Sequence, residues 1–126
     1  MKKIIFTDKA PAPIGPYSQA ILAGNTLYTS GQIALDPATM ELVINDIQTE
    51  TRQVMQNLKA VLAAADMDFS NVIKSTIFIT DMNDFAKINS VYGEYFDEDS
   101  APARETVQVS VLPKNVNIEI SMISMR

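Results

Sequence analysis

The 126-residue chain contains no histidine, no cysteine and no tryptophan. Without cysteine the fold has no disulfide and no zinc site built on thiolates. Without histidine it lacks the most common metal ligand and the side chain that most often serves as a general base near neutral pH. Proton transfer by this protein therefore depends on carboxylates, hydroxyls, lysines or backbone groups. A metal site made of carboxylates alone would favour magnesium or calcium, and the sequence has no dense Asp/Glu cluster to form one.

Basic residues are also scarce, with 10 Lys and Arg against 15 Asp and Glu and a net charge of -5. This balance argues against a broad nucleic-acid face, because phosphate binding needs clustered Lys and Arg. The apolar run Ile4–Phe6 after two lysines is far too short for a signal peptide, and no stretch approaches a membrane span. We therefore expect a cytoplasmic protein that binds neither nucleic acid nor membrane.

The length and composition are those of one globular domain covering residues 1–126. Hydrophobic residues make up 47% of the chain and charged residues 20%, which argues against disorder. A chain of this length can bury a sizeable core but is too short for two domains. No internal repeat, low-complexity tract or Gly/Ser-rich linker divides it.

The first third of the chain predicts short strands separated by rigid loops. We expect a strand at residues 3–6, followed by the segment 10–16, whose three prolines and one glycine exclude regular structure and make the loop stiff. Residues 18–22 and 26–30 then predict a hairpin around the turn dipeptide Gly24-Asn25.

The middle of the chain predicts two helices and a strand. A helix capped by Asn45 or Asp46 is expected to run to about Ala65, because apolar residues recur there at helical spacing. Residues 72–79 are rich in β-branched side chains and predict a strand. A second helix is expected over residues 84–96.

The last two strands are predicted at residues 104–111 and 116–125, where apolar and polar residues alternate. If the Pro113-Lys114 link makes a tight hairpin, Gln108 lies opposite Glu119 and every apolar residue meets an apolar one. The polar face of this pair would carry Arg104, Thr106, Gln108, Glu119 and Ser121. Such a face suits a wet interface with a partner subunit better than a core. The expected fold is α+β, a mixed sheet with two helices on its apolar face.

Two charged residues are the main candidates for chemistry. Arg104 follows a constrained Ala-Pro-Ala approach, and its guanidinium can grip a carboxylate or phosphate with two parallel hydrogen bonds. It could equally be a surface charge at a strand end. Glu119 lies between two isoleucines, where partial burial would raise its pKa and let it move a proton near neutral pH. It could also be a solvated side chain or a structural partner.

Three further residues lie in segments that suit a binding pocket. Tyr17 follows the rigid proline loop and could offer its phenol to a ligand, although most tyrosines at such positions serve packing. Ser30-Gly31 ends the hairpin, where glycine lets a ligand approach the backbone and the hydroxyl can orient it. A serine-glycine pair is common, so this signal is weak by itself.

Four motifs together resemble one known family. They are IGPYSQAI (Ile14–Ile21), YTSGQIALDP (Tyr28–Pro37), TRQVMQNLKAVL (Thr51–Leu62) and PAR followed by LPKNVNIEI (Pro102–Ile120). In this order they resemble the reactive intermediate deaminase family, RidA or YjgF, over nearly the whole chain.

The resemblance implies a chorismate-mutase-like α+β fold and a homotrimer with its sheets around the trimer axis and three pockets between subunits. It implies hydrolysis of 2-imino acids, such as 2-iminobutanoate and 2-iminopropanoate, to the 2-keto acid and ammonia. No cofactor and no metal would be needed.

Carried over to this sequence, the resemblance implies that Arg104 binds the substrate carboxylate and Glu119 activates or orients the attacking water. Tyr17 would join them as a catalytic candidate and would line the pocket with Ser30 and Gly31. Thr106 would lie beside Arg104 in the binding site.

Two positions depart from the family pattern. Thr106 stands where the family often has cysteine, which removes any role for a thiol. Glu105 stands where a small residue is usual, and strand alternation predicts that it points away from the face of Arg104.

Two alternative functions are an RNA-cleaving translation inhibitor, a role ascribed to some relatives, and a non-catalytic sensor of small carboxylates or holdase that uses the same pocket. The acidic balance and the absence of histidine weigh against RNA cleavage.

Overall fold

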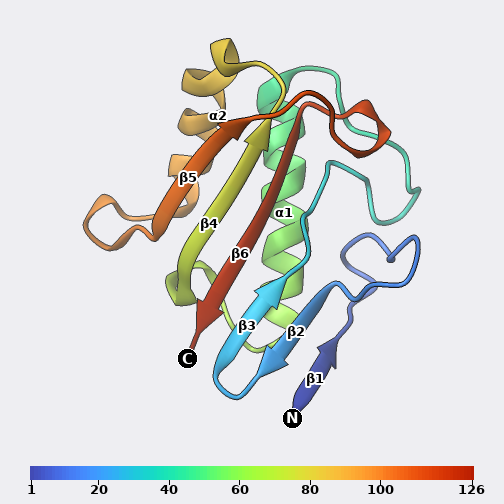
Figure 1. Ribbon diagram of the computed structural model, residues 1–126, viewed down its shortest axis with the longest axis vertical. Coiled ribbons are helices and arrows are strands. Elements are labelled where there is room, and N and C mark those ends of the chain that lie inside the picture. The colour runs from blue at the N-terminus through green and yellow to red at the C-terminus, as the bar shows by residue number, and fades with distance from the viewer.

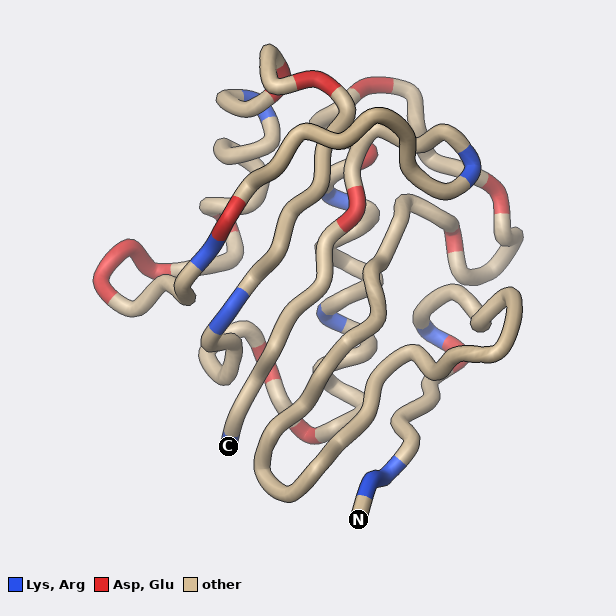
Figure 2. Tube along the Cα trace, in the orientation of Figure 1, with Lys and Arg blue, Asp and Glu red and all other residues tan.

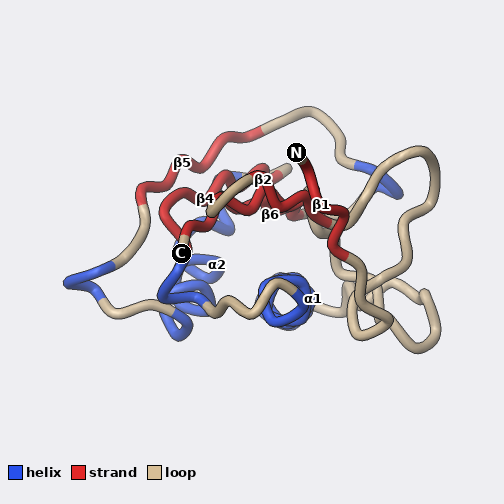
Figure 3. The backbone as a smooth tube through the Cα atoms, turned by 90° about the horizontal axis from the view of Figure 1, so that it is seen from below, coloured by secondary structure: helices blue, strands red, loops and turns tan.

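The computed structural model describes residues 1–126 and has two layers, a sheet and a pair of helices. Figure 3 shows both helices on the same side of the sheet. The six strands follow the order β1-β2-β3-β6-β4-β5, and β4 with β5 is the one parallel pair (Figure 1). The expected α+β fold with a mixed sheet is thus confirmed. The elements are β1 (Lys2–Ile5), β2 (Ala20–Ala23), β3 (Thr26–Thr29), α1 (Ile47–Ala64), β4 (Val72–Ile79), α2 (Phe85–Tyr92), β5 (Ala103–Gln108) and β6 (Ile118–Met125).

Helix α1 lies where the apolar spacing predicts it. The side chain of Asp46 caps it by accepting a hydrogen bond from the backbone N–H of Thr49 at 2.8 Å. Val54, Leu58 and Val61 form its buried face, and each is 0% exposed. Burial of each such side chain contributes about 1.5–3 kcal/mol, so the amphipathic face fixes the helix on the sheet. Helix α2 is shorter than expected, because the chain tightens into a 3₁₀ turn at Gly93.

The core lies between the sheet and the helices. Along β4 and β6 every second residue faces the helices, and Ile77, Ile79, Ile118 and Ile120 are at most 1% exposed. These four side chains belong to one hydrophobic cluster with the inner face of α1. The alternation therefore assigns the residues between them, including Glu119, to the opposite face of the sheet.

The predicted hairpin between the last two strands is wrong, because β4 lies between them. Strand β5 pairs with β4 in parallel, and β6 pairs with the other edge of β4 antiparallel, with Phe78 opposite Glu119. The chain between β5 and β6 passes the end of β4, where the Val109 N–H donates to the Ile79 carbonyl. Strand β4 is long and largely buried, so both of its edges need hydrogen-bonding partners, and an adjacent hairpin would leave one edge unpaired.

This pairing also overturns the expected polar face shared by Arg104 and Glu119. Arg104 is in register with Ser75, which is 0% exposed and accepts a hydrogen bond from Tyr92 of α2, so Arg104 points to the helix side. Glu119 points to the other side. Val107, the one valine of β5, is not a core residue either, since it is 42% exposed.

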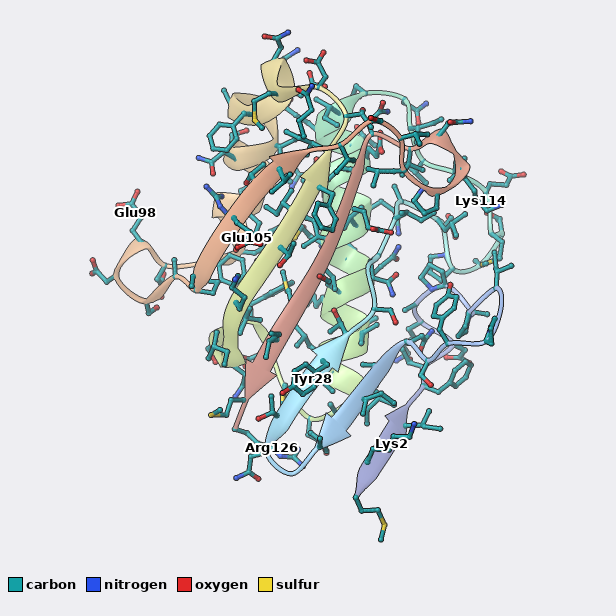
Figure 4. All side chains as sticks on the ribbon, viewed as in Figure 1. Lys2, Tyr28, Glu98, Glu105, Lys114 and Arg126 are labelled. Carbon is teal, nitrogen blue, oxygen red and sulfur yellow. The ribbon has the colours of Figure 1, made fainter.

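Glu105 lies on the face of β5 opposite to Arg104, as strand alternation predicts. Its carboxylate is 3.2 Å from the Lys74 ammonium, and Figure 4 shows it on the open face of the sheet. Glu105 therefore does not compete for the guanidinium of Arg104 within the chain.

A buried carboxylate joins α1 to the start of β6. Glu50 is 0% exposed and accepts hydrogen bonds from the backbone N–H of Asn117 at 2.7 Å and of Ile118 at 3.2 Å. The side-chain amide of Asn117 donates a further bond to it at 2.8 Å. These bonds satisfy backbone donors at the strand entrance, which would otherwise lack partners away from water.

We expect Glu50→Ala to lower the free energy of unfolding by about 2–4 kcal/mol, because it removes charge-assisted bonds and leaves buried N–H groups unpaired. Urea denaturation at one protein concentration measures the change. The matched control is Glu98→Ala, which removes an exposed carboxylate and should change stability by less than about 0.5 kcal/mol. Equal stability of the two variants would contradict this stabilising role of Glu50.

Candidate functional site

A pocket of about 500 Å³ is lined by residues of three loop segments and of β6. Its walls come from the loop between β1 and β2, the segment that follows β3, and the turn before β6. Glu119 of β6 is its acidic residue, and Lys114 is the one basic residue among those that line it. The lining also contains apolar side chains, of which Ile14, Ile33 and Leu35 are the largest. The pocket can therefore hold a small polar group beside an apolar one.

Glu119 is half-buried in this pocket. Burial raises the pKa of its carboxyl group above the ordinary glutamate value. No basic side chain forms a salt bridge with it. A carboxylate in these surroundings holds a proton more readily than one in water, and it can exchange that proton with a bound molecule.

Gly31 makes room for the carboxylate of Glu119. A β-carbon on Gly31 would lie 2.7 Å from Cδ and 3.0 Å from Oε2 of Glu119. The contact arises because the backbone of Gln32 exchanges hydrogen bonds with Ile120, at 2.8 and 3.1 Å, and so extends the sheet by one bridge. A side chain at position 31 would therefore displace the carboxylate of Glu119 from its place in the pocket.

Ser30 and Tyr17 complete the polar part of the pocket. The Ser30 hydroxyl donates to the Ser18 carbonyl at 2.5 Å, so its oxygen can still accept a hydrogen bond from a ligand. Tyr17 is 52% exposed, and its phenol oxygen accepts a hydrogen bond from the Ile14 N–H at 3.2 Å. The phenol proton is left free to face a ligand at the rim.

Arg104 and Thr106 lie outside this pocket. The guanidinium of Arg104 lies 5.0 Å from the ring centroid of Tyr92 and 5.6 Å from that of Phe85. Its Nη1 donates to the side-chain oxygen of Asn89 at 2.6 Å. These contacts orient the guanidinium at the β5 edge and leave most of its N–H groups unpaired.

Within one chain the structure thus brings together Tyr17, Ser30, Gly31 and Glu119, and it separates them from Arg104 and Thr106. Sequence reasoning missed the pocket walls contributed by Gln19 and by the turn at Lys114. The proline-rich segment could have indicated the wall that contains Gln19, because a stiff loop beside Tyr17 has to pack against the rest of the domain. Lys114 has a φ of 57°, a backbone conformation that lysine rarely adopts and that its residue type does not predict.

No group of three or more Asp and Glu side chains is placed to hold a metal ion. Neither helix is long and apolar enough to cross a membrane.

Comparison with known proteins identifies the family. The family model described as Endoribonuclease L-PSP matches residues 7–126. A RutC family protein of Pyrococcus horikoshii is 59% identical over 124 residues, which cover 98% of this chain and 98% of that protein. This chain belongs to the endoribonuclease L-PSP family. This is the RidA/YjgF family that the four sequence motifs resemble, and that assignment is confirmed.

Two other members of the family carry more specific descriptions. The 2-iminobutanoate/2-iminopropanoate deaminase of Bos taurus is 47% identical over 126 residues, which cover 100% of this chain and 91% of the bovine protein. The crystal structure of E. coli TdcF with bound serine has a TM-score of 0.92 at 48% identity and covers 98% of each chain. The chain described here therefore has the same fold as solved structures of the RidA family.

We expect Gly31→Ala to push the Glu119 carboxylate out of its site and to return its pKa toward the ordinary glutamate value, since the added methyl overlaps it. An NMR titration of the Glu119 carboxyl carbon measures the shift. Gly93→Ala is the control, because a β-carbon there meets nothing within 4 Å. A Glu119 pKa that is unchanged in Gly31→Ala would contradict the steric argument.

Proposed function

We propose that this protein hydrolyses 2-imino acids, such as 2-iminobutanoate and 2-iminopropanoate, to 2-keto acids and ammonia. The observation that carries the proposal is Glu119, a half-buried carboxylate with a raised pKa beside Gly31, in a pocket of a protein without histidine or cysteine. The name of the bovine relative supports the reaction, and the serine bound to E. coli TdcF supports a ligand of amino-acid size.

In this reaction Glu119 accepts a proton from water as the water oxygen attacks C2 of the imino acid. Glu119 passes this proton to the imine nitrogen, which gives a carbinolamine with a new C–O bond. In the second step Glu119 accepts the proton of the carbinolamine hydroxyl and delivers it to the nitrogen as the C–N bond breaks, so ammonia leaves and the 2-keto acid remains. The base has to be ionised, so the rate should fall as the pH decreases through the raised pKa of Glu119.

The carboxylate of the substrate needs a cationic partner, and we assign this role to Arg104 of a neighbouring subunit. In a single chain Arg104 points to the opposite side of the sheet from Glu119. The guanidinium is already oriented by Asn89 and Tyr92, so less entropy is lost when it grips a carboxylate bidentately. Thr106 lies on the same strand face and would line that half of the site. Tyr17 and Ser30 would contribute hydrogen bonds from the half that holds Glu119.

A homotrimer with its sheets around the trimer axis would place Arg104 and Thr106 of one subunit beside the pocket of the next. The open face of the sheet carries Tyr28, Val107 and Met125, which are 49%, 42% and 47% exposed. Figure 4 shows Tyr28 on this face, in the middle of β3. Exposed apolar side chains grouped on one face are typical of a surface that another subunit covers. A cyclic trimer would then have three equivalent sites, each with Glu119 from one subunit and Arg104 from the next.

A subunit-mixing experiment tests these roles. An amino-acid oxidase or threonine dehydratase generates the imine, and the release of keto acid is timed. We expect Arg104→Ala and Glu119→Gln each to reduce imine hydrolysis by about a hundredfold or more, because one removes the carboxylate partner and the other the base.

The two inactive variants are then unfolded together in equal amounts and refolded. In a cyclic trimer about a quarter of the sites pair an intact Glu119 with an intact Arg104, so about a quarter of the wild-type activity should return. No recovery in mixed trimers would contradict a site shared between subunits. Full activity of both variants alone would contradict the assigned roles.

RNA cleavage is a second candidate, because the family model is described as an endoribonuclease. The net charge of -5 weighs against it, and Figure 2 shows Lys and Arg dispersed over separate segments of the chain. A fluorogenic RNA assay separates the two functions. We expect no cleavage by the purified protein, and cleavage that disappears in Arg104→Ala would instead favour the nuclease. Tight binding of carboxylates without faster imine decay would favour a non-catalytic sensor or holdase.

A further inference from the structure

The loop between β1 and β2 forms one wall of the pocket but has almost no backbone hydrogen bonds of its own. Residues 6–18 contain no helix or strand, and the Tyr17 N–H to Gly15 carbonyl bond at 2.9 Å is the one backbone–backbone bond within them. The loop nevertheless contributes Pro11, Ile14 and Tyr17 to the pocket. Some other interaction has to hold it in place.

The side chain of Gln19 supplies that interaction. Gln19 directly precedes β2 and is only 1% exposed. Its Oε1 accepts a hydrogen bond from the Thr7 N–H at 2.7 Å. Its Nε2 donates to the carbonyls of Thr7 at 2.9 Å, Ala10 at 3.3 Å and Pro11 at 2.9 Å. One side-chain amide therefore makes four hydrogen bonds to the backbone of the loop.

The position of these contacts makes them a clamp. Thr7 and Pro11 lie on either side of Ala10, which is 1% exposed and belongs to the hydrophobic core. The amide thus fixes the segment that enters the core and the point where the chain leaves it for the pocket. Without the amide, buried carbonyls and an N–H group would be left without partners, and opening the loop to water would satisfy them.

Gln19 also lines the pocket, but it is only 1% exposed. Both amide hydrogens are shared among three carbonyls, and the oxygen accepts the Thr7 N–H, so the amide is directed at the loop and not at a ligand. Any effect of Gln19 on substrate therefore passes through the loop that it holds.

We propose that Gln19 is a positioning residue, whose buried amide holds residues 7–17 closed over the pocket so that Tyr17 and the apolar wall meet the substrate. The effect on substrate rests on the proposed deaminase function. The clamp itself does not, and it can be tested without any substrate.

Limited trypsin digestion of the intact full-length protein tests the clamp. Lys9 lies within the loop and is exposed, whereas Lys59 lies in the middle of α1 and can be cut only when the helix unfolds. In Gln19→Met, which keeps the shape but removes the hydrogen bonds, we expect cleavage after Lys9 to be about tenfold faster, with cleavage after Lys59 little changed. Mass spectrometry identifies the cut sites.

The matched control is Gln48→Met, which removes an exposed glutamine whose one side-chain bond goes to Ser90. This variant should be cut as the wild type is. Unchanged cleavage after Lys9 in Gln19→Met would overturn the proposal. Equal acceleration at Lys9 and Lys59 would also overturn it, because the substitution would then act on the whole fold.

Hydrogen exchange of the wild-type protein provides a test that needs no variant. The amide of Thr7 donates to the buried Oε1 of Gln19, whereas the next amide, that of Asp8, has no partner. We expect Thr7 to exchange at least about tenfold more slowly than Asp8, after correction for intrinsic rates. Equal exchange at both residues would show that the clamp is not maintained in solution.

Imine hydrolysis supplies the functional readout. In Gln19→Met we expect kcat/KM to fall about tenfold, mainly through a higher KM, because the loop contributes the binding wall while Glu119 keeps its place on β6. A fall in kcat at constant KM would contradict a positioning role through the loop. If the wild type hydrolyses no imine, the proposed function fails, and digestion and hydrogen exchange still decide whether Gln19 holds the loop.

Discussion

The structure depends on β6 lying between β3 and β4 with both of its edges paired. This position in the sheet sends Ile118, Ile120 and Met122 into the core and turns Glu119 to the opposite face. The carboxylate of Glu50 fixes the start of the strand from α1, so the register is set at its entrance as well as along its length. A slip by one residue would bury Glu119 and expose the isoleucines, which makes the placement of the acid a direct consequence of core packing.

The chemistry of the pocket follows from this placement. Because β6 pairs beyond the end of β3 with the backbone of Gln32, Gly31 is brought against the Glu119 side chain. Partial burial then raises the pKa of the carboxyl group. Two walls of the pocket are each held by a buried polar side chain. Gln19 holds the proline loop, and Asn57 of α1 donates to the carbonyls of Ile33 and Leu35. These amides do structural work close to the site of the proposed reaction.

Local patterns in the sequence were enough to predict most elements. The apolar spacing of α1 and the hairpin around Gly24 were correct, because each depends on residues near one another in the chain. Tyr17, Ser30, Gly31 and Glu119 were selected through their resemblance to family motifs; they line one pocket in the structure, and their roles stay predictions. The pairing of β5 with β6 was wrong. Alternation alone made the two strands compatible, but it held no information about a third strand, β4, that separates them.

The sequence by itself determined which side chains this protein has available for proton transfer and the family to which it belongs. A chain with no histidine or cysteine is left with carboxylates, hydroxyls, lysines or backbone groups for proton transfer, and strand periodicity assigned Glu119 to the face opposite its isoleucine neighbours. Only the tertiary structure decided that Arg104 and Glu119 lie on opposite sides of the sheet. The reason is physical: alternation fixes the two faces of a strand, whereas the identity of a strand's neighbours depends on contacts between residues far apart in the chain.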